Sequence, residues 1–359
     1  MELLFKNKET KEQILSKAEV VSPISISDDM SYLFKGDNFE IMSALLNARK
    51  GFIDLIYIDP PFNTNQIFSV SKNRANTISR KKSDTVAYSD FKTDDEFIRF
   101  MYERFVLIHE LLSDEGSLYV HIDTKMGHYF KLILDEIFGA KNFKNDITRI
   151  KSNPKNFDRK AYGNEKDMIL FYSKNPQKNI WNEIKISLEE SEFAAKFTKI
   201  DGNGRRYTTI PLHAPGETAN GITGTAWRGM LPPAGRHWRT SPEEFDKMDM
   251  LGLIEWSKTG NPRIKKYADE HKGKKIQDIW KYKDPQSPKY PTQKNLEMLE
   301  LIIKQSSKEN SIIMDCFAGS GTTLVAAAKL GRKFIGIDSS EVAIDVIKSR
   351  LSENGVCYK

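Results

Sequence analysis

Short apolar runs alternate along this chain with segments of helical periodicity, and this alternation restricts the fold more than any other feature. Helical spacing of apolar residues appears between residues 97 and 112 and between residues 296 and 303. Strands that alternate with helices form parallel sheets whose two faces are covered by those helices. The sequence therefore predicts an α/β fold with a doubly wound, mostly parallel sheet, whose clearest strands are residues 53–58, 117–122, 168–172, 311–314 and 333–337.

Two stretches interrupt the alternation. Residues 63–92 place lysines and arginines among Ser, Thr and Asn with little periodicity, and we expect them to form a mobile flap. Residues 181–283 lack the strand and helix rhythm and contain all five tryptophans of the chain. We therefore expect one main domain, formed by residues 1–180 and 284–359, interrupted by an insert at residues 181–283.

The composition excludes several classes of protein. No run of about 18 uncharged apolar residues is present, and the first ten residues are charged, so we expect a soluble, cytoplasmic protein without a membrane partner. The two cysteines, Cys316 and Cys357, are too few for a disulfide framework, and no Cys/His cluster has zinc-ligand spacing. We expect neither a disulfide nor a metal site.

Basic residues are concentrated in two segments. Residues 141–180 contain ten Lys/Arg against four Asp/Glu, and residues 258–283 contain nine against three, within a net charge of only +6. Such concentration is typical of surfaces that neutralise nucleic-acid phosphates, although lysine-rich runs are also ordinary solvated faces.

The first motif with chemical meaning is Asp59-Pro60-Pro61-Phe62, directly after the run that ends at Ile58. Two prolines cannot continue a sheet, so the chain turns at the carboxyl edge of the strand, where open α/β sheets bind ligands. An aromatic amine is a poor nucleophile because its lone pair is delocalised into the ring. If Asp59 and the Pro60 carbonyl each accepted a hydrogen bond from such an amine, the lone pair would turn toward a methyl donor, and Phe62 could stack on the extruded base. An ordinary strand-ending turn remains the alternative.

The second motif is the segment from Asp315 to Thr323, between the strand that ends at Met314 and a helix expected near Leu324. Its glycines permit a tight turn, and Thr322 or Thr323 could accept hydrogen bonds from the free amides of the helix. The third glycine of a dinucleotide motif and the Gly-Lys-Ser/Thr of a phosphate loop are both missing. Asp338 closes the next strand, where an acid can accept hydrogen bonds from ribose hydroxyls. This arrangement favours an adenosine-bearing cofactor.

Together the motifs resemble those of the beta-class DNA amino-methyltransferases, in which the catalytic motif precedes the cofactor motif. The chain is similar to the type III modification subunits and their shorter standalone relatives. The resemblance implies a Rossmann-like methyltransferase fold with permuted motif order, in which residues 181–283 form a target-recognition insert. It is carried by Gly36-Asp37-Asn38, Asp59 to Thr64, Ala87 to Phe91, Gly116 to Asp123, Tyr290 to Lys294 and Asp315 to Thr323.

The resemblance also implies S-adenosyl-L-methionine as the cofactor, lying across the carboxyl ends of the strands that leave Met314, Ile337 and Phe34. Asp37 would lie near the adenine of this donor, or would instead cap the helix that follows it. The catalytic residues would be Asp59, Pro60, Pro61 and Phe62. The residues that enclose the donor would be Asp315, Phe317, Gly319, Ser320, Gly321, Thr322, Thr323, Asp338, Thr292 and Lys294.

In this family the insert reads the DNA sequence through side chains that meet base edges, which makes its arginines candidates. Phosphate contacts and ion pairs that stabilise the fold are the alternative roles. The DNA-binding candidates are Arg228, Arg236, Arg239 and Arg263 in the insert and Lys72, Arg74, Arg80, Lys81 and Lys82 in the flap. The histidines His109, His121 and His128 have no matching partners in the sequence, and we expect them to be structural or surface residues.

These observations predict a site-specific methyltransferase that modifies N6 of a flipped adenine in double-stranded DNA. Adenine is preferred because relatives that act on cytosine N4 tend to begin the catalytic motif with serine rather than Asp59. The alternatives are a cytosine-N4 enzyme, a methyltransferase for RNA or for a protein amide, and a catalytically silent DNA-binding scaffold. By resemblance, a second copy of the chain and a cognate restriction endonuclease are candidate partners.

Overall fold

The computed structural model describes residues 2–61, 93–152, 160–218, 220–286, 288 and 293–359 in full, and only the backbone of residues 67–71, 74–76 and 85–89. The chain divides into two compact units. Unit 1 comprises residues 1–184 and 277–359, and unit 2 comprises residues 185–276. The insert expected at residues 181–283 extends beyond unit 2 at both ends, and Trp181 and Trp280 consequently belong to unit 1.

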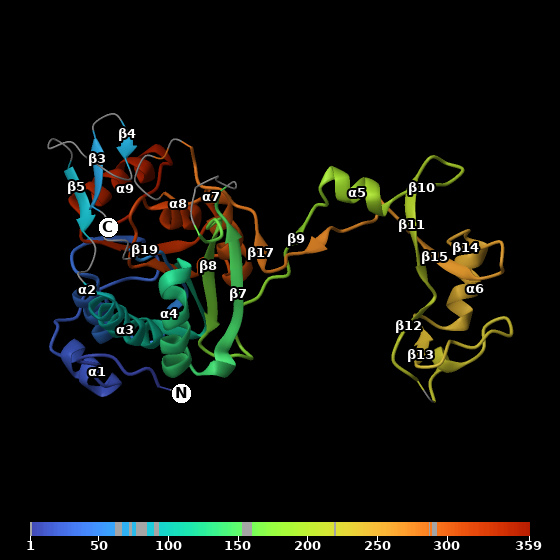
Figure 1. Ribbon diagram of the computed structural model, residues 1–359, viewed down its shortest axis with the longest axis horizontal. Helices are drawn as coiled ribbons and strands as arrows, with labels where there is room; N and C mark the ends of the chain where they lie inside the picture. Colours follow the sequence, from blue (N-terminus) through green and yellow to red (C-terminus); the bar gives the residue numbers. More distant parts are fainter. Residues whose placement is uncertain are drawn as a thin grey trace. The chain divides into compact units, whose positions relative to one another are not determined.

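Unit 1 is built on an eight-stranded sheet (Figure 1). Seven of its strands run in one direction, and only β8, which pairs antiparallel with both neighbours, runs the other way. The doubly wound, mostly parallel sheet expected from the sequence is therefore confirmed. In spatial order the strands are β1 (Tyr32–Lys35), β19 (Lys333–Asp338), β18 (Ile312–Asp315), β2 (Ile53–Ile58), β6 (Leu112–Ile122), β8 (Lys166–Ser173), β7 (Phe143–Ile150) and β17 (Ile279–Trp280).

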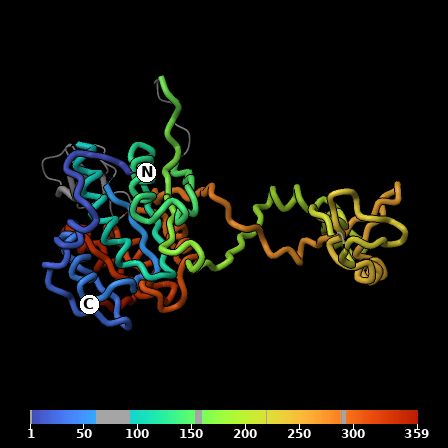
Figure 2. The backbone as a smooth tube through the Cα atoms, turned by 90° about the horizontal axis from the view of Figure 1, so that it is seen from below, coloured from blue at the N-terminus to red at the C-terminus, as the bar shows by residue number. Residues whose placement is uncertain are grey.

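Segments from the two ends of the chain lie side by side in this sheet. β1 pairs in parallel with β19, and β2 pairs in parallel with β18, so blue and red stretches of the backbone adjoin each other in Figure 2. Central strands of a parallel sheet are buried on both faces and can be apolar throughout. This explains why β2 and β18 were among the strands that the sequence predicted most clearly.

Two groups of helices cover the two faces of the sheet (Figure 1). The long helix α3 contributes the buried stripe Phe97, Met101, Phe105 and Ile108, and its start is fixed by a capping box between Thr93 and Glu96. The first group is α1 (Lys11–Glu19), α2 (Asn38–Ala48), α3 (Asp94–Leu111) and α4 (Thr124–Phe138), which the short helix η1 (Ala140–Asn142) follows. The second group is α7 (Leu296–Ser306), α8 (Thr322–Lys329) and α9 (Glu341–Glu353).

The segment expected to be a flap contains strands, which the sequence did not predict. β3 (Ile67–Ser71), β4 (Arg74–Asn76) and β5 (Thr85–Ser89) form an antiparallel sheet with β3 in the centre. No strand was predicted here because runs of three to five residues are too short for their alternation to stand out from the surrounding polar residues.

Unit 2 has its own core, formed by Leu212, Trp227, Trp238, Phe245, Ile254 and Ile264. Four of these side chains come from β13, α6, β14 and β15, whereas Leu212 lies between β11 and β12 and Trp227 lies in the segment between η2 and β13. The strands form a four-stranded antiparallel sheet of order β10-β11-β15-β14 and a two-stranded sheet of β12 and β13. The elements are β9 (Lys185–Ile186), α5 (Glu190–Lys196), β10 (Lys199–Ile200), β11 (Arg206–Pro211), β12 (His213–Pro215), η2 (Ile222–Gly224), β13 (Arg236–Trp238), α6 (Pro242–Met250), β14 (Ile254–Trp256), β15 (Pro262–Tyr267) and β16 (Lys274–Lys275). In the described part of the chain, no helix is both long and apolar enough to span a membrane.

Candidate active site

Asp59 stands immediately after β2, where two prolines prevent the strand from continuing. Its side chain is 15% exposed, and its Oδ2 atom lies 2.8 Å from the ammonium of Lys294. Its Oδ1 atom is buried and has no hydrogen-bond partner among the residues that the structure describes. Because a buried acceptor without a donor costs free energy, Oδ1 is a position that an N–H group of a ligand can fill. Pro60 is buried and Pro61 is half-buried, whereas Phe62 lies outside the described residues.

Lys294 approaches Asp59 from the segment that precedes α7. Only 9% of its side chain is exposed, so the ion pair is shielded from water. The sequence placed Lys294 among the residues expected to enclose the methyl donor. The structure shows in addition that Lys294 forms an ion pair with Asp59, which the sequence did not suggest. Thr292, predicted beside it, lies outside the described residues.

The turn after β18 is organised around Asp315. Its carboxylate accepts the backbone N–H of Phe317 at 3.0 Å and the hydroxyl of Thr323 at 2.6 Å. Burial raises the pKa of Asp315 to about 7, and the nearby carboxylate of Asp59 adds to this rise. Gly319 and Gly321 have φ values of +50° and +70°, which glycine adopts without the steric penalty of a Cβ atom. The tight turn expected from the sequence is therefore present.

The expectation that Thr322 or Thr323 would cap the helix was wrong. Helix α8 starts at Thr322 with Gly321 as its N-cap, and no described side chain accepts a hydrogen bond from its first amides. Thr323 is instead held by Asp315, and Thr322 lies 2.9 Å from the hydroxyl of Ser320. The amides of the first turn of α8 thus have no side-chain partner within the described part of the chain, and helix amides in this position bind carboxylates and phosphates.

Arg350 of α9, which the sequence did not single out, donates hydrogen bonds to the same turn. Its guanidinium donates to the carbonyl of Ser320 and, at 3.0 Å, to the hydroxyl of Thr322. Burial lowers the pKa of Arg350, but a guanidinium stays charged under all ordinary conditions. Arg350 lies 30 residues beyond Ser320, in helix α9, so no local pattern pointed to it.

Asp338 ends β19, the strand next to β18, as the sequence predicted. Its two carboxylate oxygens accept the backbone N–H groups of Gly319 and Ser340, each at 2.8 Å. Burial raises the pKa of Asp338 in spite of these hydrogen bonds. Each carboxylate oxygen retains a second lone pair, so the side chain can still accept a hydrogen bond from a ligand hydroxyl.

Asp37 caps α2 by accepting hydrogen bonds from the amides of Phe39 and Glu40. The capping role that the sequence offered as one of two readings is therefore present, and the side chain remains 49% exposed. Arg104 of α3 reaches Asp37 at 3.2 Å and Asn38 at 2.9 Å, and it stacks on the ring of Phe100. The sequence missed Arg104 because it lies within the apolar stripe of α3.

His121 is fully buried, and the expectation that it has no matching partner was wrong. Its Nδ1 atom lies 2.8 Å from the Tyr57 hydroxyl, and its Nε2 atom lies 3.3 Å from Asp167. The missed signal is that a polar residue stands inside the apolar run 117–122 and that an acid stands just before the apolar run 168–172. Of the two other histidines that the sequence analysis considered, His109 forms a hydrogen bond with Glu110 and His128 is exposed.

The topology brings these groups to one edge of the sheet. β1, β19, β18, β2 and β6 are successive neighbours and run in parallel, so their carboxyl ends, which lead into Asp37, Asp338, Asp315, Asp59 and Asp123, lie along the same edge. β2 and β18 are direct neighbours, with Leu55 opposite Ile313 and Ile56 opposite Met314. The acidic turn after β2 and the Gly-rich turn after β18, 256 positions apart when counted from Asp59 to Asp315, therefore leave the sheet side by side.

The predicted DNA-binding arginines of unit 2 fall into two kinds. Arg228 is engaged in the fold, because it forms ion pairs with Asp246 and Asp249. The other three are Arg236, Arg239 and Arg263, and none of them has an acidic partner among the described residues. Burial lowers the pKa of His213, and the charges of these three arginines lower it further. We call these three residues the arginine cluster. In the flap, the side chain of Arg74 is not described, and Lys72, Arg80, Lys81 and Lys82 lie outside the described residues.

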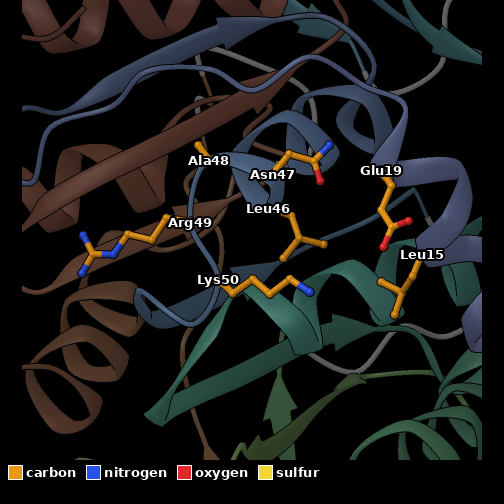
Figure 3. A pocket seen from close by; sticks show the side chains of 7 residues that line it. All are labelled: Leu15, Glu19, Leu46, Asn47, Ala48, Arg49 and Lys50. Carbon is orange, nitrogen blue, oxygen red and sulfur yellow. The ribbon is translucent and has the colours of Figure 1, made fainter.

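A surface pocket of about 310 Å³ between α1 and α2 does not belong to this site (Figure 3). It is lined by Leu15 and Glu19 of α1 and by residues 46–50, at the end of α2 and just before β2. The segment before β2 enters the sheet at the amino edge of the strand, whereas Asp59 stands at the carboxyl edge. The pocket and the candidate site are consequently at opposite edges of the sheet.

Comparison with known proteins agrees with this geometry. The pattern of the family described as DNA methylase, the N6/N4 methyltransferases, matches residues 53–349. The type II methyltransferase M.EcaI of Enterobacter cloacae is 39% identical over 329 residues, which are 90% of this chain and 69% of that protein. The Mod subunit of the type III restriction-modification enzyme StyLTI of Salmonella typhimurium is 25% identical over 354 residues, 90% of this chain and 53% of the subunit.

Among solved structures, the M1.HpyAVI–SAM complex aligns with a TM-score of 0.46 and 20% identity, covering 90% of this chain and 100% of that one. Members of the matched family transfer methyl groups from S-adenosylmethionine. The family match covers both the acidic turn and the Gly-rich turn. The chain belongs to the N6/N4 DNA methylase family.

Proposed function

We propose that this protein transfers a methyl group from S-adenosylmethionine to N6 of an adenine that is flipped out of duplex DNA. The observation that carries this proposal is the buried, unpartnered Oδ1 atom of Asp59, which stands beside the Gly-rich turn at the carboxyl edge of the sheet. An enzyme that methylates an exocyclic amine needs an acceptor at this place, next to the site that holds the methyl donor.

Asp59 and Pro60 would orient the target amine. One N–H of the amine would donate to Oδ1 of Asp59 and the other to the carbonyl of Pro60, which turns the nitrogen lone pair toward the methyl group. Positive charge develops on the nitrogen as the new N–C bond forms, and the adjacent carboxylate stabilises it. The methylated amine then loses one proton to water, because its cation is strongly acidic. Phe62 would stack on the base, which must leave the duplex to reach the site.

The residues around the Gly-rich turn fit the chemical groups of S-adenosylmethionine. When bound, this donor supplies an electrophilic methyl group on a sulfonium ion. The uncapped amides at the start of α8 suit its carboxylate, and Asp338 retains lone pairs for ribose hydroxyls. Asp37 is exposed at the end of β1, within reach of a ligand that lies across β18, β19 and β1.

The choice of adenine over cytosine rests on Asp59. An acidic residue at the first position of the catalytic motif is typical of family members that act on adenine, whereas serine is typical of those that act on cytosine N4. Both bases present an exocyclic amine with two N–H groups, so the pair of acceptors fits either of them. The names of the relatives support a role in a restriction-modification setting.

Unit 2 would recognise the target DNA, and the arginine cluster would form part of the contact surface. Three guanidinium groups whose charges all act on His213, and which have no acidic partner among the described residues, are suited to phosphates or to guanine edges. Backbone carbonyls and hydroxyls hold two of them in place, since Arg263 donates to Thr209 and Arg239 donates to the carbonyl of Pro211. Arg228 would stabilise the unit instead, through Asp246 and Asp249.

The test of the reaction is transfer of a labelled methyl group from S-adenosylmethionine to duplex DNA, followed by digestion to nucleosides. The proposal expects N6-methyldeoxyadenosine, and N4-methyldeoxycytidine would overturn the choice of adenine. Asp59→Ala should abolish transfer while the affinity for the donor, measured by calorimetry, changes little. Asp54→Ala, which removes a carboxylate near the amino end of β2, is a control for the fold and should retain transfer. Unchanged transfer by Asp59→Ala would refute the role given to this residue.

The test of the recognition surface is the salt dependence of DNA binding. Replacing Arg236, Arg239 or Arg263 singly by Gln should weaken binding, and each lost phosphate contact should lower the slope of log affinity against log salt by about 1. Arg228→Gln is the matched control, since it removes an arginine of the same unit whose charge is already compensated. If Arg228→Gln changed the slope as much as the other three variants, the arginine cluster would not be the contact surface.

A further inference from the structure

A chain of buried polar groups lies next to Asp59 and has no part in the chemistry described so far. Tyr57, His121 and Asp167 are all buried, although they come from three neighbouring strands, β2, β6 and β8. The hydroxyl of Tyr57 lies 2.8 Å from Nδ1 of His121, and Nε2 of His121 lies 3.3 Å from Oδ2 of Asp167. The same Nδ1 atom lies 3.9 Å from Oδ1 of Asp59. We call these three residues the histidine array.

The charges around the array determine which nitrogen of His121 carries the proton. Lys151 lies 2.6 Å from Asp167, and Arg149 lies 3.6 Å from it. Although burial opposes ionisation, the hydrogen bonds from His121 and Lys151 hold the pKa of Asp167 well below its usual value. Burial lowers the pKa of His121, and the Asp167 hydrogen bond only partly offsets this effect. The imidazole is therefore neutral, and the ionised Asp167 requires its Nε2–H as a donor.

With the proton on Nε2, the Nδ1 atom carries a lone pair and must accept a hydrogen bond. Tyr57 supplies it, because burial raises the pKa of its hydroxyl and keeps that group protonated. His121 therefore offers no N–H to Asp59, although its ring is close enough to do so after a small shift. This accounts for the finding that no described residue donates a hydrogen bond to Oδ1 of Asp59.

We propose that the histidine array is a positioning device for methyl transfer: it holds His121 in the Nε2–H tautomer so that Oδ1 of Asp59 stays open for the amine of the target base. This inference rests on the proposed function, since it assigns to His121 the task of keeping open the acceptor which that function uses. An Nδ1–H group would compete with the target amine for Oδ1 and would weaken the orientation of its lone pair.

Other charged groups lie near the array, and their titration must be considered when the variants and the pH profile are interpreted. Lys294 holds the second oxygen of Asp59, and Arg149 is also paired with Asp284 and donates to the carbonyl of Tyr282. Among the described residues, the groups that act on His121 or its partners include Asp59, Lys294, Tyr57, Asp167, Lys151, Arg149, Asp284, Asp315 and Asp123. Each of them comes from unit 1, so that binding of DNA by unit 2 can be measured separately.

The first experiment observes the tautomer directly in the unmodified protein. In the full chain labelled with ¹⁵N-histidine, the couplings between ring nitrogens and ring protons distinguish Nε2–H, Nδ1–H and the doubly protonated ring. The signal that disappears in His121→Gln identifies His121. We expect the neutral Nε2–H form near pH 7.5, and an Nδ1–H form or an imidazolium at this pH would overturn the proposal.

The second experiment changes the tautomer and measures single-turnover methylation. Asp167→Asn replaces the acceptor at Nε2 by a side chain that can donate, which favours the Nδ1–H form, and we expect the rate to fall at least tenfold with unchanged donor affinity. Tyr119→Phe is the matched control. It removes an equally buried tyrosine hydroxyl from β6 that bonds to Ser306 instead of to the array, so the rate at a temperature where the variant is folded should fall less than threefold. Equal losses in the two variants would indicate a merely structural role and would overturn the proposal.

A pH profile of the parent protein links the two measurements and remains informative if Asp167→Asn does not fold. Protonation of His121 creates an Nδ1–H group, so the rate should decline toward acid pH with the same midpoint as the titration of His121 seen by NMR. Separate midpoints would contradict the role assigned to the array. A parent protein that transfers no methyl group to DNA would instead overturn the proposed function, and the two failures are therefore distinguishable.

Discussion

Three carboxylates, those of Asp59, Asp315 and Asp338, are central to the candidate site, and their surroundings differ. Asp59 is half-buried beside Lys294, and Asp338 accepts two backbone amides. Asp315 is buried, and none of the described residues places a cation beside it. Burial penalises a charged carboxylate, whereas a nearby cation or N–H donor stabilises it. The three acids after β2, β18 and β19 are therefore not equivalent, even though each ends a strand in the same sheet.

Asp315 should make the stability of the protein depend on pH. Its pKa in the folded state is raised to about 7, so the unfolded chain loses this proton first as the pH rises. The contribution of Asp315 to the free energy of unfolding is thus highest at acid pH and falls between about pH 4 and about pH 7. Asp315→Asn cannot ionise, and the stability of this variant relative to the parent should rise by roughly 3 kcal/mol between about pH 4 and about pH 8.

Urea unfolding at the two pH values measures this difference. Asp345→Asn, which changes an exposed carboxylate on α9, is the control and should show no comparable trend. A constant difference between Asp315→Asn and the parent would mean that Asp315 is already ionised in the folded protein at acid pH.

At the scale of elements, the Gly-rich turn is held between β18 and two helices. Asp315 binds it from the strand side, Thr323 anchors it to α8, and Arg350 of α9 supports Ser320. The turn is consequently fixed by α9 as well as by its own glycines. A local motif in the sequence thus depends on a helix that begins 18 residues after its last residue, Thr323.

Gly321 should tolerate a side chain much less well than Gly331, although both have a φ of +70°. A Cβ atom on Gly321 would lie 2.9 Å from Cγ1 of Ile347 in α9, whereas a Cβ atom on Gly331 would meet no atom within 4 Å. Both alanine variants incur the backbone penalty of the left-handed conformation, about 1 kcal/mol. Gly321→Ala adds a clash in a packed region, which typically costs about 1 to 3 kcal/mol more.

Chemical denaturation of the two alanine variants gives the comparison, and calorimetry with S-adenosylmethionine gives its functional counterpart. We expect weaker donor binding only for Gly321→Ala, because relief of the clash must displace either the turn or α9. Equal destabilisation of the two variants would show that α9 does not constrain the turn.

At the scale of the whole molecule, the chain forms two units with separate cores. The core of unit 1 lies on its parallel sheet, and that of unit 2 consists of six buried side chains, among them two tryptophans. Phe245, fully buried in unit 2, packs against Trp227 and Trp238 with ring centroids 5.3 and 5.8 Å away. The residues proposed for the donor all belong to unit 1, and the arginine cluster belongs to unit 2.

Phe245→Ala should therefore destabilise unit 2 and leave donor binding intact. Removal of a buried phenylalanine typically costs about 3 to 5 kcal/mol, and the tryptophans of unit 2 should report an earlier thermal transition in their fluorescence. Calorimetry should still detect S-adenosylmethionine binding with the affinity of the parent, whereas DNA binding should be lost. Phe105→Ala, which removes an equally buried ring from unit 1, is the reciprocal control and should impair donor binding. Loss of donor binding in Phe245→Ala would mean that the two units do not fold independently.

The sequence by itself determined the features that depend on local order. Continuous apolar runs identified β2, β18 and β19, because central strands of a parallel sheet are buried on both faces. The prolines after Asp59 and the glycines after Asp315 identified the two turns, because backbone conformation at these residues is decided locally. These features were enough to predict the fold class, the Gly-rich turn and the edge of the sheet where the site lies.

Only the tertiary structure decided which side chains meet. Lys294 pairs with Asp59 from 235 positions away, Arg350 supports Ser320 from another helix, and His121 joins Tyr57 to Asp167 across three strands. Strand order is set by the packing of helices on the two faces of the sheet, and no local pattern records it. The partners of a buried polar group follow from that order, so the sequence contained the residues of the histidine array without any signal that they are neighbours.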